Sequence, residues 1–210
     1  MSEPAFTGDV DPGPQPGEHT SVLEAPLSQA VAGSASARAE LLSVLRPMVL
    51  HYCRGRLGRQ ETGLLSAEDV AQDVCLAVVN ALPTYQITER SFRAFVYGIA
   101  AHKVADAQRA AVRNSVAAPV AEISDEPDTT EPGPEQSAER NDLARRLSGL
   151  LARLSETHRE IVLLRVAVGL SAEEVGEVVG MTAAAVRVTQ SRALARLRTL
   201  AADSLREVAA

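Results

Sequence analysis

The sequence predicts an all-α protein built from two small helical domains that a flexible acidic linker joins. Hydrophobic residues make up 46% of the 210 residues, and Ala and Leu, which favour helices, are abundant among them. No segment alternates apolar and polar residues between turn signals, as a half-buried strand would. Instead, apolar residues recur at helical spacing in several segments that begin at Ser or Thr or end at Gly.

Charge is distributed unevenly along the chain, although its formal net charge is -6. Residues 1–35 hold five acidic residues and no basic one, and residues 114–142 hold eight acidic residues and one basic one. By contrast, residues 36–113 and 143–210 each hold ten basic and seven acidic residues. The acidity therefore belongs to a tail and a linker, and the two helical blocks are basic enough to contact nucleic acid.

Domain boundaries follow from these shifts in composition. The expected order is a disordered N-terminal tail (1–27), a first helical domain (28–113), an acidic Pro-rich linker (114–137), a second helical domain (138–202) and a C-terminal tail (203–210). No apolar run reaches the roughly 18 residues of a membrane span, and the N-terminus lacks the basic and apolar parts of a signal peptide. We therefore expect a cytoplasmic protein without membrane insertion.

The first domain begins with a helical pattern over residues 37–58, in which Pro47 predicts a break or a new first turn. A second helix is predicted after Ser66, a good N-cap, and its apolar stripe contains Val70, Val74 and Val78. The polar side chains on the opposite face of this second helix point outward. These are Asp69, Gln72 and Asp73.

The third helix of this domain, "SFRAFVYGIAAHKVADAQRAAVR" (residues 91–113), is basic and aromatic. Residues 90–113 hold five bases and one acid, together with three of the six aromatic residues of the chain. Aromatic rings stack on unpaired bases while cations follow the phosphates, so this composition suits single-stranded nucleic acid. The alternative is that Phe92 and Phe95 are core anchors, and we favour this alternative for Phe95.

The second domain ends in a helix-turn-helix pattern. A helix over about 138–153 precedes one capped by Ser155, and Ser171 with Glu174 then forms a capping box at the next helix. Gly180 supplies a turn, and a last helix begins after Thr182 and runs to about Leu200.

The last helix carries side chains that can reach DNA bases or phosphates. Its N-terminal half presents Arg187, Thr189, Gln190, Ser191 and Arg192, and Arg196 lies further along. The alternative is the solvated basic face of an ordinary helical hairpin, and we favour DNA binding over it.

The C-terminal block resembles region 4 of the sigma factors of bacterial RNA polymerase, in particular the extracytoplasmic-function (group IV) class of the sigma-70 family. The similar segments are "LSETHREIVLLR", "GLSAEEV" and "VGMTAAAVR". The resemblance implies that this domain reads the −35 promoter element and contacts the flap of the polymerase. Members of the class often have Lys-Ser-Arg where this chain has Arg187, Val188 and Thr189, so their −35 base preference does not transfer to it.

The N-terminal block resembles sigma region 2. "AEDVAQDVCLAVV" is similar to the helix that docks on the clamp helices of core RNA polymerase, which implies docking through Asp69, Gln72 and Asp73. "SFRAFVYGIAAHKVADAQR" is similar to the helix that opens and reads the −10 element, and residues 83–90 fall where the class captures a flipped base. The resemblance assigns −10 DNA binding to Arg93, Tyr97, Asp106 and Arg109, and the basic residues Lys103 and Arg113 of the same helix are predicted to join them. The segments "GLLSAEDVAQDVCLA" and "YGIAAHKVADAQRAA" of this block are most similar to the actinobacterial sigma-D-like group.

We therefore expect a sigma factor that binds core RNA polymerase and directs promoter recognition, −10 melting and initiation, with an anti-sigma factor as a further partner. The alternative is a helix-turn-helix activator that does not replace the specificity subunit of the polymerase. An enzyme is not expected, because the sequence has no P-loop, nucleophile motif or metal-ligand cluster. No cofactor is predicted.

Overall fold

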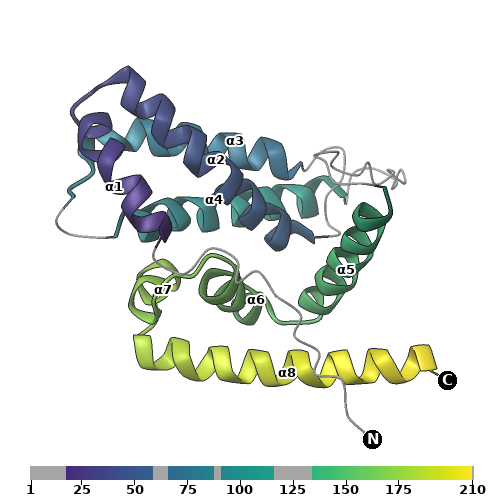
Figure 1. Ribbon diagram of the computed structural model, residues 1–210. Helices are drawn as coiled ribbons and strands as arrows, with labels where there is room; N and C mark the ends of the chain where they lie inside the picture. The colour runs from purple at the N-terminus through teal and green to yellow at the C-terminus, as the bar shows by residue number, and fades with distance from the viewer. Residues whose placement is uncertain (1–17, 59–65, 88–90, 116–133, 210) are drawn as a thin grey trace, which may run out of the picture.

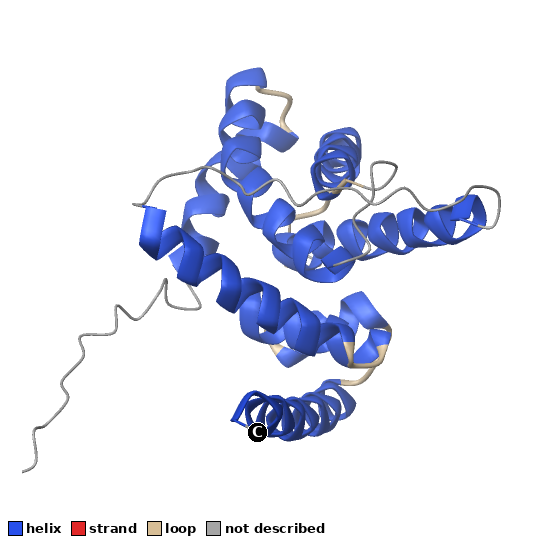
Figure 2. Cartoon of the chain, turned by 90° about the vertical axis from the view of Figure 1, so that its right-hand side faces the viewer, coloured by secondary structure: helices blue, strands red, loops and turns tan. Residues whose placement is uncertain are grey.

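The computed structural model describes residues 18–58, 66–87, 91–115 and 134–209, and within these ranges all regular structure is helical, as the sequence predicts (Figures 1 and 2). The N-terminal half contains α1 (Glu18–Val31), α2 (Ala35–Leu57), α3 (Ala67–Ala81), the short 3-10 helix η2 (Leu82–Thr84) and α4 (Phe92–Ser115). The C-terminal half contains α5 (Pro134–Ala152), α6 (Glu156–Val162), the π-helical segment η3 (Leu163–Ala167), α7 (Ala172–Val179) and α8 (Ala183–Ala209).

Helix α2 is the central helix of the N-terminal bundle, packing against α1, α3 and α4. Its buried face includes Leu41, Leu45, Val49 and Tyr52, each at most 2% exposed. The break predicted at Pro47 is wrong, because α2 continues through this proline to Leu57. Burial of Leu45 and Val49 on either side contributes roughly 1.5–3 kcal/mol each, which offsets the roughly 3 kcal/mol cost of an internal proline.

Helix α1 begins inside the segment expected to be a disordered tail up to residue 27. Leu23, Leu27 and Ala30 recur on one of its faces and are buried against the rest of the bundle. This apolar stripe explains why the helix starts at Glu18 rather than after the expected tail. Residues 1–17 lie outside the described residues.

Three aromatic residues, Tyr85, Phe92 and Phe95, form a packed cluster at the start of α4. Tyr85 contacts Phe92 with a ring-centroid distance of 5.3 Å and Phe95 with one of 4.9 Å. Phe92 is only 7% exposed, and Phe95 packs partly buried against the same core. Both phenylalanines are therefore core anchors in this structure.

In the C-terminal half, the predicted helix boundaries are confirmed where a capping residue lies next to the helix end. Ser155 accepts a hydrogen bond from the His158 amide, and Ser171 forms the complete capping box with Glu174 at the start of α7. Gly180 ends α7 in the left-handed conformation, with φ 69°. Helix α8 continues to Ala209, beyond the expected end near Leu200.

The two halves pack against each other, which the expected arrangement of separate domains did not include. Figure 1 shows α6 and α7 between the N-terminal helices and the long helix α8. Residues from both halves share one core, and those from the C-terminal half are Ile161, Leu164, Leu170, Ala172, Val175 and Val186. Most of the expected linker, residues 116–133, lies outside the described residues.

Candidate polymerase and promoter interfaces

Helix α3 presents a polar face to the outside, because its opposite face is buried. Val70, Val74 and Val78 pack into the core at 7% exposure or less, which turns Asp69, Gln72 and Asp73 outward. Ser66 fixes the start of the helix by accepting hydrogen bonds from two backbone amides, those of Glu68 (3.1 Å) and Asp69 (3.4 Å). The three residues predicted to dock on the polymerase therefore share one exposed surface.

Leu76 extends this polar face and was not among the predicted docking residues. It lies seven positions after Asp69 and three after Asp73, so it shares their side of the helix. It is 55% exposed, whereas Val70, Val74 and Val78 of the same helix are buried. The spacing alone could have identified Leu76, because an apolar residue at this position falls outside the Val70–Val74–Val78 stripe.

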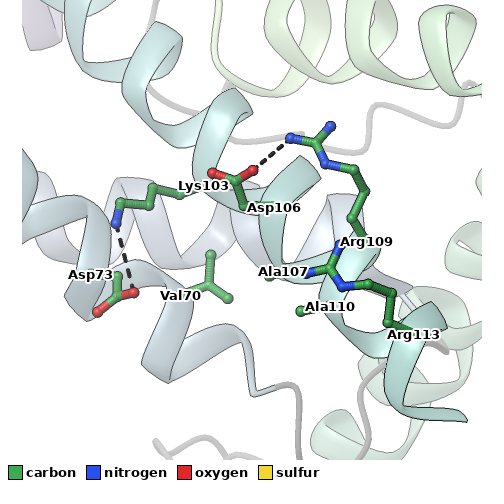
Figure 3. Close-up of a pocket in the computed structure, with 8 residues that line it drawn as sticks. All are labelled: Val70, Asp73, Lys103, Asp106, Ala107, Arg109, Ala110 and Arg113. Atoms are coloured by element: carbon green, nitrogen blue, oxygen red, sulfur yellow. Dashed lines mark hydrogen bonds and ion pairs between the residues drawn. The ribbon is translucent and has the colours of Figure 1, made fainter.

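A surface cavity of about 360 Å³ lies between α3 and α4 (Figure 3). Two ion pairs cross or border it, one between Lys103 Nζ and Asp73 Oδ2 at 3.9 Å and one between Arg109 and Asp106 at 2.5 Å. It is lined by Val70, Asp73, Lys103, Asp106, Ala107, Arg109, Ala110 and Arg113. The cavity thus brings one predicted docking residue next to four residues predicted to bind −10 DNA.

The other two residues predicted to bind −10 DNA are placed differently. Arg93 is only 6% exposed and donates a hydrogen bond to the backbone carbonyl of Val168, just after η3. Tyr97 is 2% exposed, and its ring packs edge-on against Tyr52 with centroids 5.3 Å apart. Burial raises the pKa of Tyr97 well above its ordinary value. Neither side chain is accessible to DNA in this arrangement of the two halves.

A buried polar cluster joins α2 to α6. The Tyr52 hydroxyl donates to Glu160 Oε1 at 2.5 Å, and Arg56 forms ion pairs with Glu160 and, at 3.2 Å, with Glu156. Arg56 is 3% and Glu160 is 6% exposed. Burial raises the pKa of Glu160, and the nearby Arg56 charge and the Tyr52 hydrogen bond oppose that rise.

The capping box of α7 also reaches across to the N-terminal half. Glu174 accepts the Ser171 backbone amide at 2.6 Å, and its other carboxylate oxygen accepts the hydroxyl proton of Ser91 at the start of α4. The Glu174 side chain therefore both caps the start of α7 and connects α7 to the start of α4 by a hydrogen bond. Sequence reasoning could not find the contact with Ser91, because 83 positions separate Ser91 from Glu174.

The turn between α7 and α8 is tight, as a DNA-binding helix-turn-helix requires. A Cβ added to Gly176 would lie 2.5 Å from the backbone carbonyl oxygen of Met181, so only glycine fits where the two helices approach. The Thr182 hydroxyl then accepts the Ala185 amide at 3.2 Å and caps α8. This turn sets the direction in which α8 leaves α7.

The residues predicted to bind −35 DNA all lie on the first half of α8. The four that are exposed are Arg187, Ser191, Arg192 and Arg196, whereas Thr189 and Gln190 are half-buried. Arg187 pairs with Glu173 at 2.5 Å, and Gln190 Oε1 accepts a hydrogen bond from Arg165 at 3.1 Å. The exposed residues therefore form the more accessible part of the predicted site.

Within the described ranges, no group of His, Cys, Asp and Glu side chains could hold a metal ion, and no helix is long and apolar enough to cross a membrane. Cys53 is buried and Cys75 half-buried, and the two form no disulfide in the described part of the chain.

Comparisons with known proteins match both halves of the chain to one family. Residues 41–114 match the model of sigma-70 region 2, and residues 150–199 match that of sigma-70 region 4. The chain is 52% identical to the extracytoplasmic-function (ECF) RNA polymerase sigma factor SigD of Mycobacterium tuberculosis, over 84% of this chain and 82% of SigD. It is 49% identical to the ECF sigma factor ShbA of Streptomyces griseus, over 88% of this chain and 97% of ShbA. Among solved structures it is similar to CnrH in complex with the cytosolic domain of CnrY, with 25% identity, a TM-score of 0.64, and coverage of 87% of this chain and 98% of CnrH.

Proposed function

The chain belongs to the sigma-70 family of RNA polymerase sigma factors, and from this membership we propose how its residues divide the work of promoter recognition. As a sigma factor it directs promoter-specific transcription. The observation that carries the residue-level proposal is the cavity between α3 and α4, which joins the exposed face of α3 to the basic side chains of α4.

The first function is docking on the clamp helices of core RNA polymerase through Asp69, Gln72 and Asp73. Their exposure on one face of α3 supports this role, and Leu76 adds an apolar contact at the end of the same face. An exposed carboxylate pair beside an apolar side chain suits a partner surface that is basic with an apolar centre.

The second function is opening and binding the −10 element through α4. Lys103, Arg109 and Arg113 supply positive charge for the phosphates, and Asp106 orients Arg109 through their 2.5 Å ion pair. The third function is reading the −35 duplex through α8. In this scheme residues 28–113 and 138–202 are the two functional units, and the flap of the polymerase contacts the second.

The packed arrangement of the two halves has to open for both elements to be bound together. Elements centred near −10 and −35 lie about 25 base pairs apart, which is about 85 Å at about 3.4 Å per base pair. In the structure Arg93 of α4 donates directly to the Val168 carbonyl just before α7, so the two proposed DNA-binding units touch. The segment between α4 and α5, residues 116–133, spans up to about 60 Å when fully extended, which allows the two units to separate. Separation would also release Arg93 from the Val168 carbonyl and make its side chain available to DNA.

Polymerase binding supplies the affinity that each unit lacks alone. Each helical block has an excess of only three basic residues, so the free protein should bind promoter DNA weakly and with strong salt dependence. Joining two modest DNA sites on one polymerase raises their effective concentration. We place the chain in the cytoplasm with the polymerase. An anti-sigma factor is a further partner, consistent with the complex of CnrH with CnrY.

Run-off transcription with core RNA polymerase tests this proposal. The alternative, an activator that does not replace the specificity subunit, predicts no association between the chain and core polymerase lacking a sigma factor. Sigma factors are not enzymes, so no catalytic step is assigned to the chain itself.

A further inference from the structure

Val188 is an exposed apolar side chain in the middle of the proposed −35 reading surface. It is 50% exposed on the second turn of α8, where its helix neighbours three and four positions on are Ser191 and Arg192. Arg187, directly before it, is also exposed. Half of its surface therefore faces solvent, whereas Val186, Ala193 and Leu200 of the same helix are at most 1% exposed.

Several polar side chains around Val188 already have partners within the protein. The Arg187 guanidinium is held by Glu173 from the start of α7, and the Gln190 side-chain oxygen is held by Arg165 from η3. Thr189 is half-buried. The side chains that project freely from this face are therefore Val188, Ser191 and Arg192.

The residues on either side of Val188 along the helix face are small. Ala184 lies one turn before it and Ser191 one turn after it, and both are exposed. Val188 therefore has short side chains directly before and after it along this line of the helix, and the longer Arg192 lies beside Ser191. The short neighbours let the methyl groups of Val188 approach a groove floor.

The major groove offers one apolar group to such a side chain. Of the base-edge groups it displays, only the C5-methyl of thymine is apolar, and the others donate or accept hydrogen bonds. Resting on the proposed function of α8, we propose that Val188 reads the C5-methyl of a thymine in the −35 element. The chain therefore selects thymine at one −35 position through an apolar contact, and the side chain that makes this contact is Val188 of its recognition helix.

Removal of the thymine methyl tests this contact on −35 segments of any sequence. Holoenzyme assembled from core polymerase and the full chain is challenged with two synthetic promoter libraries in one round of selection. Both carry the same randomised −35 segment, which contains thymidine in one library and deoxyuridine in the other. Uracil pairs as thymine does and lacks only the methyl group, so base pairing is unchanged.

We expect wild-type holoenzyme to enrich thymine at one −35 position. In the deoxyuridine library the enrichment of uracil at that position should be about fourfold lower, because one buried methyl-sized contact is lost. In the Val188→Ala variant the two libraries should give the same enrichment at that position. Val166→Ala is the matched control, because Val166 is a 60% exposed valine on η3, outside the recognition helix, and its replacement should preserve the difference between the libraries.

Equal selection from both libraries by wild-type holoenzyme overturns the inference, and so does a methyl preference that persists in Val188→Ala. In both cases the selection of a −35 sequence would still support the proposed function. Failure of the proposed function has a different signature, since the holoenzyme would then select no −35 sequence at all and initiate at no promoter in the library.

Discussion

The Tyr52 hydroxyl donates a hydrogen bond to the Glu160 carboxylate at 2.5 Å, joining α2 and α6 across 108 positions of sequence. Both residues are buried, and Arg56 from the next turn of α2 pairs with the same carboxylate. The contact between the halves therefore contains the Glu160 carboxylate of α6, whose partners, Tyr52 and Arg56, both belong to α2. Removing one partner leaves a buried polar atom without full compensation.

Tyr52→Phe should lower the free energy of unfolding by about 1–3 kcal/mol, because Glu160 loses a hydrogen-bond donor while it stays buried. Urea denaturation followed by circular dichroism measures the change. Tyr97→Phe is the matched control, since it removes the same oxygen from the ring that packs against Tyr52. A larger loss of stability in the Tyr97 variant than in the Tyr52 variant would contradict this account.

The raised pKa of Glu160 predicts how this contact depends on pH. Burial makes the folded state bind the Glu160 proton more tightly than the unfolded state, where the pKa is about 4.3. The resulting contribution to stability is fully present below that unfolded pKa and is lost as pH rises through the folded pKa. The stability of wild type relative to Glu160→Gln should therefore decrease as pH rises from acid, which urea titrations at a series of pH values will show. An increase over this range would contradict the prediction.

Gly176→Ala should disrupt the helix-turn-helix. The added Cβ would lie 2.5 Å from the Met181 carbonyl oxygen, which belongs to the turn backbone and can move only if α8 moves. We expect a loss of about 1–3 kcal/mol in unfolding free energy and loss of initiation at −35-dependent promoters. Gly149→Ala in α5 is the control, because no atom lies within 4 Å of its added Cβ, and it should be neutral or stabilising by up to about 1 kcal/mol. Equal stability losses in the two variants would refute the steric explanation.

Leu76→Ala should weaken the affinity for core polymerase by about fivefold or more, about 1 kcal/mol, if this side chain is an apolar anchor in the docking face. Binding of labelled protein to core polymerase gives the dissociation constant. Leu143→Ala provides the comparison, because Leu143 is 67% exposed on α5, outside the proposed docking face, and should leave the affinity unchanged. An unchanged affinity in Leu76→Ala would remove Leu76 from the docking face.

The features that the sequence predicted correctly depend on residues close together in the chain. The caps at Ser66 and Ser155, the capping box of Ser171 with Glu174 and the turn at Gly180 each involve residues within a few positions of one another. The outward face of α3 followed from the spacing of three valines. Local chemistry of this kind determines where a helix begins and which side it buries.

The features that the sequence did not predict depend on contacts between distant segments. Pro47 predicts a break in isolation, and only the packing of α2 against three other helices explains its continuity. The contacts from Arg56 to Glu160 and from Arg93 to Val168 join helices that no sequence spacing relates. For this reason Arg93 was predicted to bind DNA, and its burial against the C-terminal half could not be predicted from the sequence.

Run-off transcription by core RNA polymerase tests the central claim most directly, with genomic promoter fragments as templates. The account predicts transcripts with defined start sites only when the chain is added. It also predicts loss of these transcripts and of core association in the Asp69→Ala/Asp73→Ala double variant, and their retention in Asp142→Ala, which changes an aspartate on α5 outside the docking face. Identical transcription with and without the chain, or full activity of the double variant, would contradict the account.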